Sequence, residues 1–206
     1  MLTVYLVRHG ETDYNAEGRL QGHLPIPLND RGRAQAKRLA RKFQEIQVDA
    51  IYSSDLPRAV QTAEIVAELK GLPIHTDARF RERSLGHWEG RLYSEVEREL
   101  EEKNWISHTN GESLENVRHR VMQALSEFTK TLDGKSILLV AHGGSCHGIL
   151  STIAGPDYGK GFLTWHNTAV SILRWEERNG WSVVDLYDDE HLEGDGINFA
   201  EAISRT

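Results

Sequence analysis

The sequence contains a single cysteine, Cys146, among its 206 residues. One cysteine excludes an internal disulfide framework and is typical of a protein in a reducing compartment. No segment approaches the run of about 20 apolar residues that a membrane-spanning helix needs, so we expect no membrane partner. Residues 1–10 also lack the apolar middle and cleavage site of a signal peptide, which predicts a cytoplasmic protein.

The sequence also lacks an excess of positive charge, because its formal net charge is −7. A nucleic-acid-binding protein usually carries a basic patch, so we expect no nucleic-acid partner. There is no HExxH motif, and His142 and His147 do not have the i, i+4 spacing that aligns two metal ligands on a helix. We therefore expect no metal. The glycines that follow His142 form no phosphate-binding P-loop, because no Gly-Lys-Ser/Thr comes after them.

Short apolar runs alternate with longer segments of helical periodicity, which predicts an α/β sandwich. Strands are expected at 3–8, 49–54, 136–141, 169–176 and 181–187, the last two joined by a hairpin turn at Asn179-Gly180. Helical spacing is expected from Asn29 or Asp30 to Ile46, from Ala59 to a stop at Gly71, from a cap at Ser113 to Gly134, and from Gly143 to about Gly155.

No repeat, low-complexity linker or break in composition divides the chain. We therefore expect one domain over residues 1–206, with 83–110 as a small lid and 190–206 as a C-terminal tail. The tail is polar and contains glycine. It either folds over the mouth of a pocket, with His191 or Leu192 lining it, or frays.

Three of the expected strands end on residues that suit an anion. The first ends on Arg8-His9, the second leads through Ser53-Ser54 to Arg58, and the third ends on His142-Gly143-Gly144. In an open parallel sheet, ligands bind beyond the carboxyl ends of the strands, where helix N-termini direct amide groups at anions. Two histidines and two arginines are therefore expected to meet at one edge of the sheet, around a phosphoryl group.

Four segments carry a resemblance to a known family. They are LVRHGETDYN at 6–15, SSDLPRAVQTA at 53–63, RERSLGHWEG at 81–90 and LLVAHGG at 138–144. In order and spacing they resemble the histidine phosphatase superfamily, which includes cofactor-dependent phosphoglycerate mutases and many small phosphomonoesterases. The resemblance spans about residues 3–155. It implies a phosphoglycerate mutase-like fold, a three-layer α/β/α sandwich with a mostly parallel sheet.

The resemblance implies that His9 becomes a transient phosphohistidine. The residues agree, because a nucleophilic imidazole must be neutral and the neighbouring Arg8 disfavours the imidazolium. The planar guanidinium groups of Arg8 and Arg58 match phosphate oxygens bidentately, and a bound anion would relieve the unfavourable position of Arg58 in the first turn of its helix. His142 would donate a hydrogen bond to a phosphoryl oxygen in the transition state. Structural roles stay open for three of them: His9 and His142 as histidines satisfied by hydrogen bonds within the fold, and Arg58 as a solvated surface arginine.

Glu82 matches the acid/base glutamate of the superfamily, which protonates the departing oxygen and later accepts a proton from water. The role calls for a partly desolvated carboxyl group, with Trp88 as the expected apolar neighbour. Glu89 is the local alternative. The structural alternative is a solvated Glu82 paired with Arg81 or Arg83.

Further residues match the pattern of the superfamily in the phosphate-binding region. Asn15 and the turn at Gln21-Gly22 would add a side-chain amide and backbone N–H groups, and Thr12 matches more weakly. Together with Gly143, these are the predicted substrate-binding residues.

Two features depart from the superfamily. Many relatives carry an arginine shortly after the HGG motif, where this chain has Cys146-His147. Phosphoglycerate mutases usually have a basic insertion where this chain has EVERELEEKNW at 95–105. An acidic lid would oppose a doubly phosphorylated ligand and favours hydrolysis over mutase chemistry, although a solvated helix face explains the same charges.

The sequence therefore predicts a histidine acid-type phosphatase. It would hydrolyse a small phosphate monoester through a phosphohistidine on His9, with Glu82 as general acid and base and without a cofactor. The alternatives are a cofactor-dependent phosphoglycerate mutase and a catalytically idle phosphate-sensing or protein-binding module, although His9, Glu82 and His142 are all present. The physiological substrate and the oligomeric state, monomer or homodimer, stay open.

Overall fold

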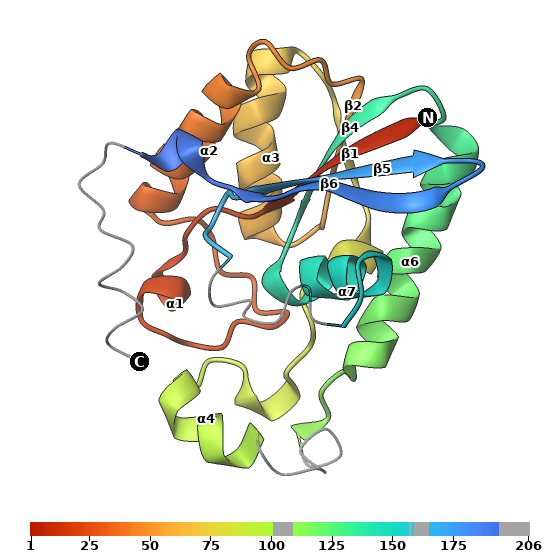
Figure 1. The fold of residues 1–206 in the computed structure, drawn as a ribbon. Coiled ribbons are helices and arrows are strands. Elements are labelled where there is room, and N and C mark those ends of the chain that lie inside the picture. The colour runs from red at the N-terminus through yellow and green to blue at the C-terminus, as the bar shows by residue number, and fades with distance from the viewer. Residues whose placement is uncertain (101–108, 157, 159–164, 194–206) are drawn as a thin grey trace.

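A six-stranded sheet forms the centre of the computed structural model, which describes residues 1–100, 109–156, 158 and 165–193 (Figure 1). The strands are β1 (Leu2–Arg8), β2 (Ala50–Ser53), β3 (Ile74–Thr76), β4 (Ser136–Ala141), β5 (Val170–Glu176) and β6 (Gly180–Asp188). Their order is β3-β2-β4-β1-β5-β6, with the first four parallel and β5 and β6 added antiparallel. The predicted α/β class with a mostly parallel sheet is confirmed.

Helices cover both faces of this sheet (Figure 1). Packed on one face are α2 (Asp30–Lys42) and α3 (Pro57–Lys70), and on the other α6 (Leu114–Thr131) and α7 (Gly143–Ile153). The shorter elements are α1 (Asp13–Ala16), α4 (Tyr93–Leu100), η1 (Ala78–Phe80), η2 (Gly86–Trp88) and η3 (Glu190–Leu192). These layers form the predicted α/β/α sandwich.

The alternation of side chains along the strands divides the core in two. Val4 and Leu6 of β1 pack toward α6 and α7, whereas Val7 packs toward α2 and α3. Residues 137–141 of β4 are all buried, because helices cover both faces of the sheet there. This burial explains why the strand is apolar almost throughout. The sheet is thus fixed on both sides, and its strand ends hold the residues that follow them.

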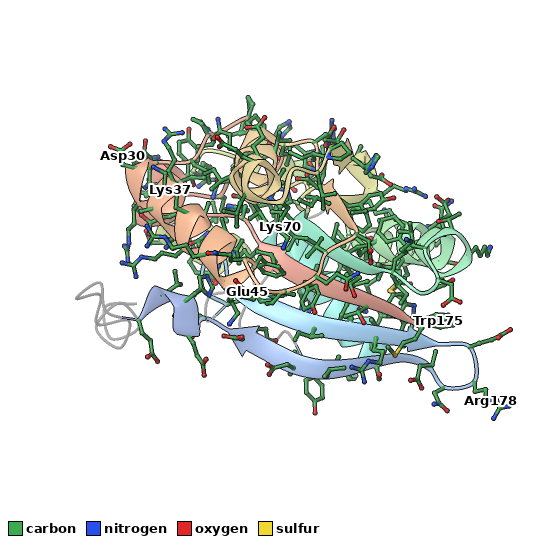
Figure 2. All side chains as sticks on the ribbon, turned by 90° about the horizontal axis from the view of Figure 1, so that it is seen from above. Asp30, Lys37, Glu45, Lys70, Trp175 and Arg178 are labelled. Carbon is green, nitrogen blue, oxygen red and sulfur yellow. The ribbon has the colours of Figure 1, made fainter. Side chains whose placement is uncertain are left out.

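One helix is shorter than its periodicity predicts. The expectation that the helix from Asn29 reaches Ile46 is wrong, because α2 ends at Lys42. Lys70 at the end of α3 lies beside this point (Figure 2) and donates from Nζ to the carbonyl oxygens of Phe43, Gln44 and Ile46, at 2.9, 3.2 and 2.9 Å. These carbonyl groups are satisfied by a cation instead of by another helical turn.

The predicted caps and hairpin occur as expected. Asn29 and Ser113 accept hydrogen bonds from the amides of Gly32 and Asn116, and Gly71 ends α3 at φ +65°. The β5–β6 hairpin turns just after Arg178, which lies at its tip (Figure 2). The short strand β3 and the 3-10 helices were not predicted, because segments of three residues carry no readable periodicity.

The predicted lid and tail are described only in part. The lid region contains η2 and α4, and residues 101–108 lie outside the described residues. Leu192 of the tail is buried, and Arg38 of α2 donates to the carbonyl oxygens of Leu192 and Glu193. The described start of the tail therefore packs against α2, and residues 194–206 lie outside the described part.

Candidate active site

The parallel register of β1 and β4 brings the two histidines together. Arg8 is paired with Ala141, and the amide of His9 donates to the carbonyl oxygen of Ala141 at 3.0 Å. His9 and His142 directly follow these two strands, and they therefore leave the sheet at the same edge. Their ring centroids are 5.1 Å apart.

His9 is held as a neutral imidazole. Its side chain is buried, and Nδ1 lies 2.7 Å from the carbonyl oxygen of Gly10. A carbonyl oxygen can only accept, so Nδ1 carries the hydrogen and Nε2 keeps its lone pair. Burial, followed by the positive charges of Arg58 and Arg8, lowers the pKa of His9 well below its usual value. The ring thus has the tautomer and charge state of a nucleophile.

His142 is the N-cap residue of α7, is fully buried, and has two ring nitrogens without a hydrogen-bond partner among the described residues. Burial, then Arg58 and His9, lowers its pKa well below the usual value. Buried polar atoms are nearly always hydrogen-bonded, and an unpaired one costs about 1–3 kcal/mol. The ring nitrogen of His142 that carries the hydrogen could donate to an acceptor bound between the two histidines.

Arg58 places a buried positive charge beside the histidines. Its side chain is 0% exposed, and Nη1 and Nη2 donate to the carbonyl oxygens of Leu24 and Gly22 at 3.0 and 2.8 Å. Within the described ranges it forms no ion pair, and its Nε has no partner. Burial lowers its pKa to about 10. A buried cation without a paired anion is costly, and a bound anion would lower that cost.

Arg8 is the second guanidinium group at this edge. It donates from Nη1 to the carbonyl oxygen of Trp165, in the loop that precedes β5. Burial lowers the pKa of Arg8, and the charge of Glu82 opposes that shift. Arg8 and Arg58 both interact electrostatically with Glu82 and with His9, so all four groups share one site.

Glu82 lies at the N-terminus of α7. Its Oε1 accepts hydrogen bonds from the amides of Gly144 and Arg83, each at 2.8 Å. A Cβ atom at position 144 would lie 2.3 Å from Oε1, so glycine leaves room for the carboxyl group here. Trp88 is buried in η2, but its expected apposition to Glu82 stays a prediction.

Glu89, the alternative acid/base residue, has a different environment. Its Oε1 accepts from the amide of Leu85 at 3.0 Å and from the hydroxyl of Ser84 at 3.3 Å. The carboxyl group also packs against Gly22, where a Cβ atom would come within 2.1 Å of Oε1. Glu89 thus contacts two loops, whereas Glu82 contacts the first turn of α7, the helix that His142 caps.

Three of the predicted substrate-binding residues, Thr12, Asn15 and Gln21, are connected at α1, and Gly22 and Gly143 lie elsewhere. Thr12 caps α1, and its hydroxyl oxygen lies 3.1 Å from Asn15 Oδ1 and 3.0 Å from Gln21 Oε1, so its one O–H can donate to either. Thr12 is buried and braces the two amide side chains. Gly22 holds Arg58 through its carbonyl oxygen, and Gly143 is the first residue of α7.

Two residues at the site have no signal in the sequence. Asn167, in the loop before β5, donates from Nδ2 to the carbonyl oxygen of His9 at 2.9 Å. Arg120 of α6 pairs with Glu112 at 2.7 Å and donates to the carbonyl oxygens of Arg79, Arg81 and Glu82. It therefore fixes the main chain that carries Glu82. From the sequence alone, Arg120 is one of many charged residues on a helix.

The described residues contain neither a metal-binding cluster nor a membrane-spanning helix. Over residues 1–100, 109–156, 158 and 165–193, no three His, Cys, Asp or Glu side chains are grouped so that they could hold a metal ion. Nor does any helix in those ranges have the length and apolar character to cross a membrane.

The fold and this site define a class of α/β proteins with paired histidines and arginines at the carboxyl edge of a parallel sheet. A family model for the histidine phosphatase superfamily (branch 1) matches residues 4–189. The chain belongs to this superfamily.

Individual relatives cover almost the whole chain. A probable phosphoglycerate mutase GpmB from Enterobacter sp. (strain 638) is 36% identical, over 96% of this chain and 98% of that protein. The solved structure of Bacillus stearothermophilus YhfR has a TM-score of 0.83 at 30% identity, covering 94% of this chain and 100% of the other. A mycobacterial glucosyl-3-phosphoglycerate phosphatase in complex with VO3 has a TM-score of 0.77 at 27% identity, covering 90% and 98%.

Proposed function

We propose that the protein is a phosphomonoesterase that hydrolyses a small phosphorylated metabolite in two steps. The observation that carries the proposal is a buried, neutral His9 whose Nε2 keeps its lone pair, next to an Arg58 cation without an ion pair in the described part of the chain. A nucleophile and an unmet positive charge at one place suit attack on a phosphoryl group.

In the first step, the phosphoryl oxygens bind to Arg8, Arg58, His142 and the Asn15 amide. Nε2 of His9 attacks phosphorus in line, and the bond from phosphorus to the ester oxygen breaks. Glu82, in its protonated form, transfers a proton to that oxygen, so the alcohol leaves neutral.

In the second step, Glu82 takes a proton from a water molecule, which attacks phosphorus. The bond from phosphorus to Nε2 breaks, inorganic phosphate leaves, and both His9 and Glu82 return to their starting states. Arg58 and the other donors stabilise the charge on the phosphoryl oxygens throughout. A similar structure supports this class of substrate: phosphoserine phosphatase from Entamoeba histolytica, 25% identical with a TM-score of 0.80, was solved in complex with 3-phosphoglyceric acid.

The first test is His9→Ala. We expect kcat on an aryl phosphate to fall by at least about a thousand-fold, because the nucleophile is lost. His119→Ala is the matched control, since His119 is an exposed histidine on α6, and it should keep the activity of the native protein. Near-native activity of His9→Ala would exclude the mechanism.

A phosphoglycerate mutase is the second candidate, favoured by the 36% identity of this chain to probable phosphoglycerate mutases GpmB. A mutase must keep the phosphohistidine from water and hold a bisphosphate. Incubation with 3-phosphoglycerate and its bisphosphate primer distinguishes the two functions: isomerised product without released phosphate favours the mutase, and released phosphate favours the hydrolase.

A further inference from the structure

The loop that precedes β5 runs directly along the end of β1. The amide of Thr168 donates to the carbonyl oxygen of Arg8 at 2.9 Å, and the amide of Arg8 donates to the carbonyl oxygen of Ala169 at 3.4 Å. Between these bonds, Nδ2 of Asn167 donates to the carbonyl oxygen of His9 at 2.9 Å and to Oδ1 of Asn15 at 3.4 Å. One side-chain amide thus connects the predicted nucleophile with the predicted phosphate-binding amide.

This connection fixes the orientation of Asn15. Its Oδ1 also accepts from the amide and the hydroxyl of Thr12, at 3.2 and 3.1 Å. A flipped side chain would set the NH2 group of Asn15 against these donors, so the observed orientation is the favourable one. Among the described residues, no hydrogen bond uses Nδ2 of Asn15. Its two N–H groups are therefore left to an acceptor outside this network, as a phosphoryl oxygen would be.

The loop itself is held from its other side. Thr168 is fully buried with φ +68°, an unusual backbone conformation for a β-branched residue, and its hydroxyl pairs with Nε2 of His191 at 3.0 Å. His166 pairs through Nδ1 with Asp189. The neighbouring Asp188 forms an ion pair with Lys42 of α2, with 2.6 Å between Oδ2 and Nζ. A strained backbone persists where its surroundings hold it, and such positions gather at functional sites.

We propose that Asn167 is a positioning residue: its amide holds the main chain of His9 and the side chain of Asn15 so that the Asn15 NH2 group faces the phosphoryl group. The inference rests on the proposed function, in which Asn15 binds that group. Asn167 itself need not touch the substrate, because it acts through its two acceptors.

A double-mutant cycle tests this coupling. We expect Asn15→Ala and Asn167→Ala each to lower kcat/KM on an aryl phosphate about tenfold and to weaken inhibition by inorganic phosphate to a similar degree. The loss in the double variant should be clearly smaller than the product of the two single losses, because part of the effect of Asn167 passes through Asn15. Asn179→Ala is the control: its amide also donates to a side chain, Glu176, but in the β5–β6 hairpin, and activity should not change.

Multiplicative losses in the double variant would overturn the coupling, even if both single variants are impaired, and so would an Asn167→Ala protein of native kcat/KM. If Asn167→Ala does not fold, Asn167→Asp keeps the size of the side chain and removes the donor, and the same outcomes apply to it. A native kcat/KM for Asn15→Ala would instead refute the role of Asn15 in phosphate binding. The proposed function as a whole is tested separately, by His9→Ala.

Discussion

Arg79 and Arg81 differ from Arg58 in the groups that their guanidinium groups bind. Arg79 pairs with Glu127 and Asp77, and these hydrogen bonds raise its pKa. Arg81 pairs with Asp55, with Nε and Oδ1 at 2.7 Å. Arg58 is more deeply buried than either, yet it forms no ion pair within the described residues, and its pKa is lowered.

The difference separates support from binding. An arginine matched by carboxylates has its charge neutralised within the fold, and an added anion gains little from it. A buried arginine bound only to carbonyl oxygens keeps its charge available, at a cost in stability that the rest of the protein must offset. His142 carries no such charge, but its ring nitrogens are also unpaired in the described part of the protein, so its N–H group is available to a ligand.

The largest loss of activity among these arginines should come from Arg58→Met. We expect kcat/KM to fall by about a thousand-fold, because one donor to the transition-state charge typically contributes about 3–4 kcal/mol. Thermal unfolding should shift little, since methionine does not bury a charge. Steady-state kinetics and Tm measure the two quantities, and a variant within tenfold of native activity would show that Arg58 is structural.

A smaller effect is expected from Glu82→Gln. Loss of proton transfer should lower kcat on an alkyl phosphate by about a hundred-fold and have less effect on an aryl phosphate, whose leaving group needs no proton. Glu89→Gln serves as the control and should stay within a few-fold of native activity. If the two variants exchanged behaviour, Glu89 would be the acid/base residue.

The pH dependence of stability should report the two buried histidines. Both have a lower pKa in the folded than in the unfolded protein, so the unfolded chain binds more protons below about pH 6.5. The free energy of unfolding should therefore decrease as pH falls below this value, by up to about 1.4 kcal/mol per pH unit for each histidine. Urea titrations at several pH values measure the slope, and His142→Gln should reduce it. A slope that His142→Gln leaves unchanged would contradict the assignment.

The smallest effect on activity should come from Arg79→Met, because Arg79 is paired with carboxylates. Its ion pairs lie at the surface, where such pairs contribute little, so kcat/KM should not change and Tm should fall by a few degrees at most. A loss of activity comparable with that of Arg58→Met would contradict the distinction between Arg79 and Arg58.

The chemistry-bearing strand ends could be predicted because each is local. Arg8-His9 and His142-Gly143 directly follow apolar runs, and the parallel order of the strands brings those ends to one edge. The roles of these residues, in contrast, stay predictions until they are tested.

Other features depend on contacts that no local pattern encodes. Asn167 bonds to a carbonyl group 158 positions away, and its neighbours in the sequence resemble an ordinary loop. The bonds of Arg120 also go to main-chain oxygens, which exist in every residue and therefore leave no mark in the sequence. Likewise, the carbonyl oxygen of Phe43, just after the end of α2, is bound by Lys70 of another helix.

The most direct test of the central claim is to trap the intermediate. Rapid quenching into base during turnover, followed by peptide mapping, should find an acid-labile, base-stable phosphoryl group on His9, formed at least as fast as product. Turnover without an adduct on His9, or with the phosphoryl group on another residue, would contradict the account.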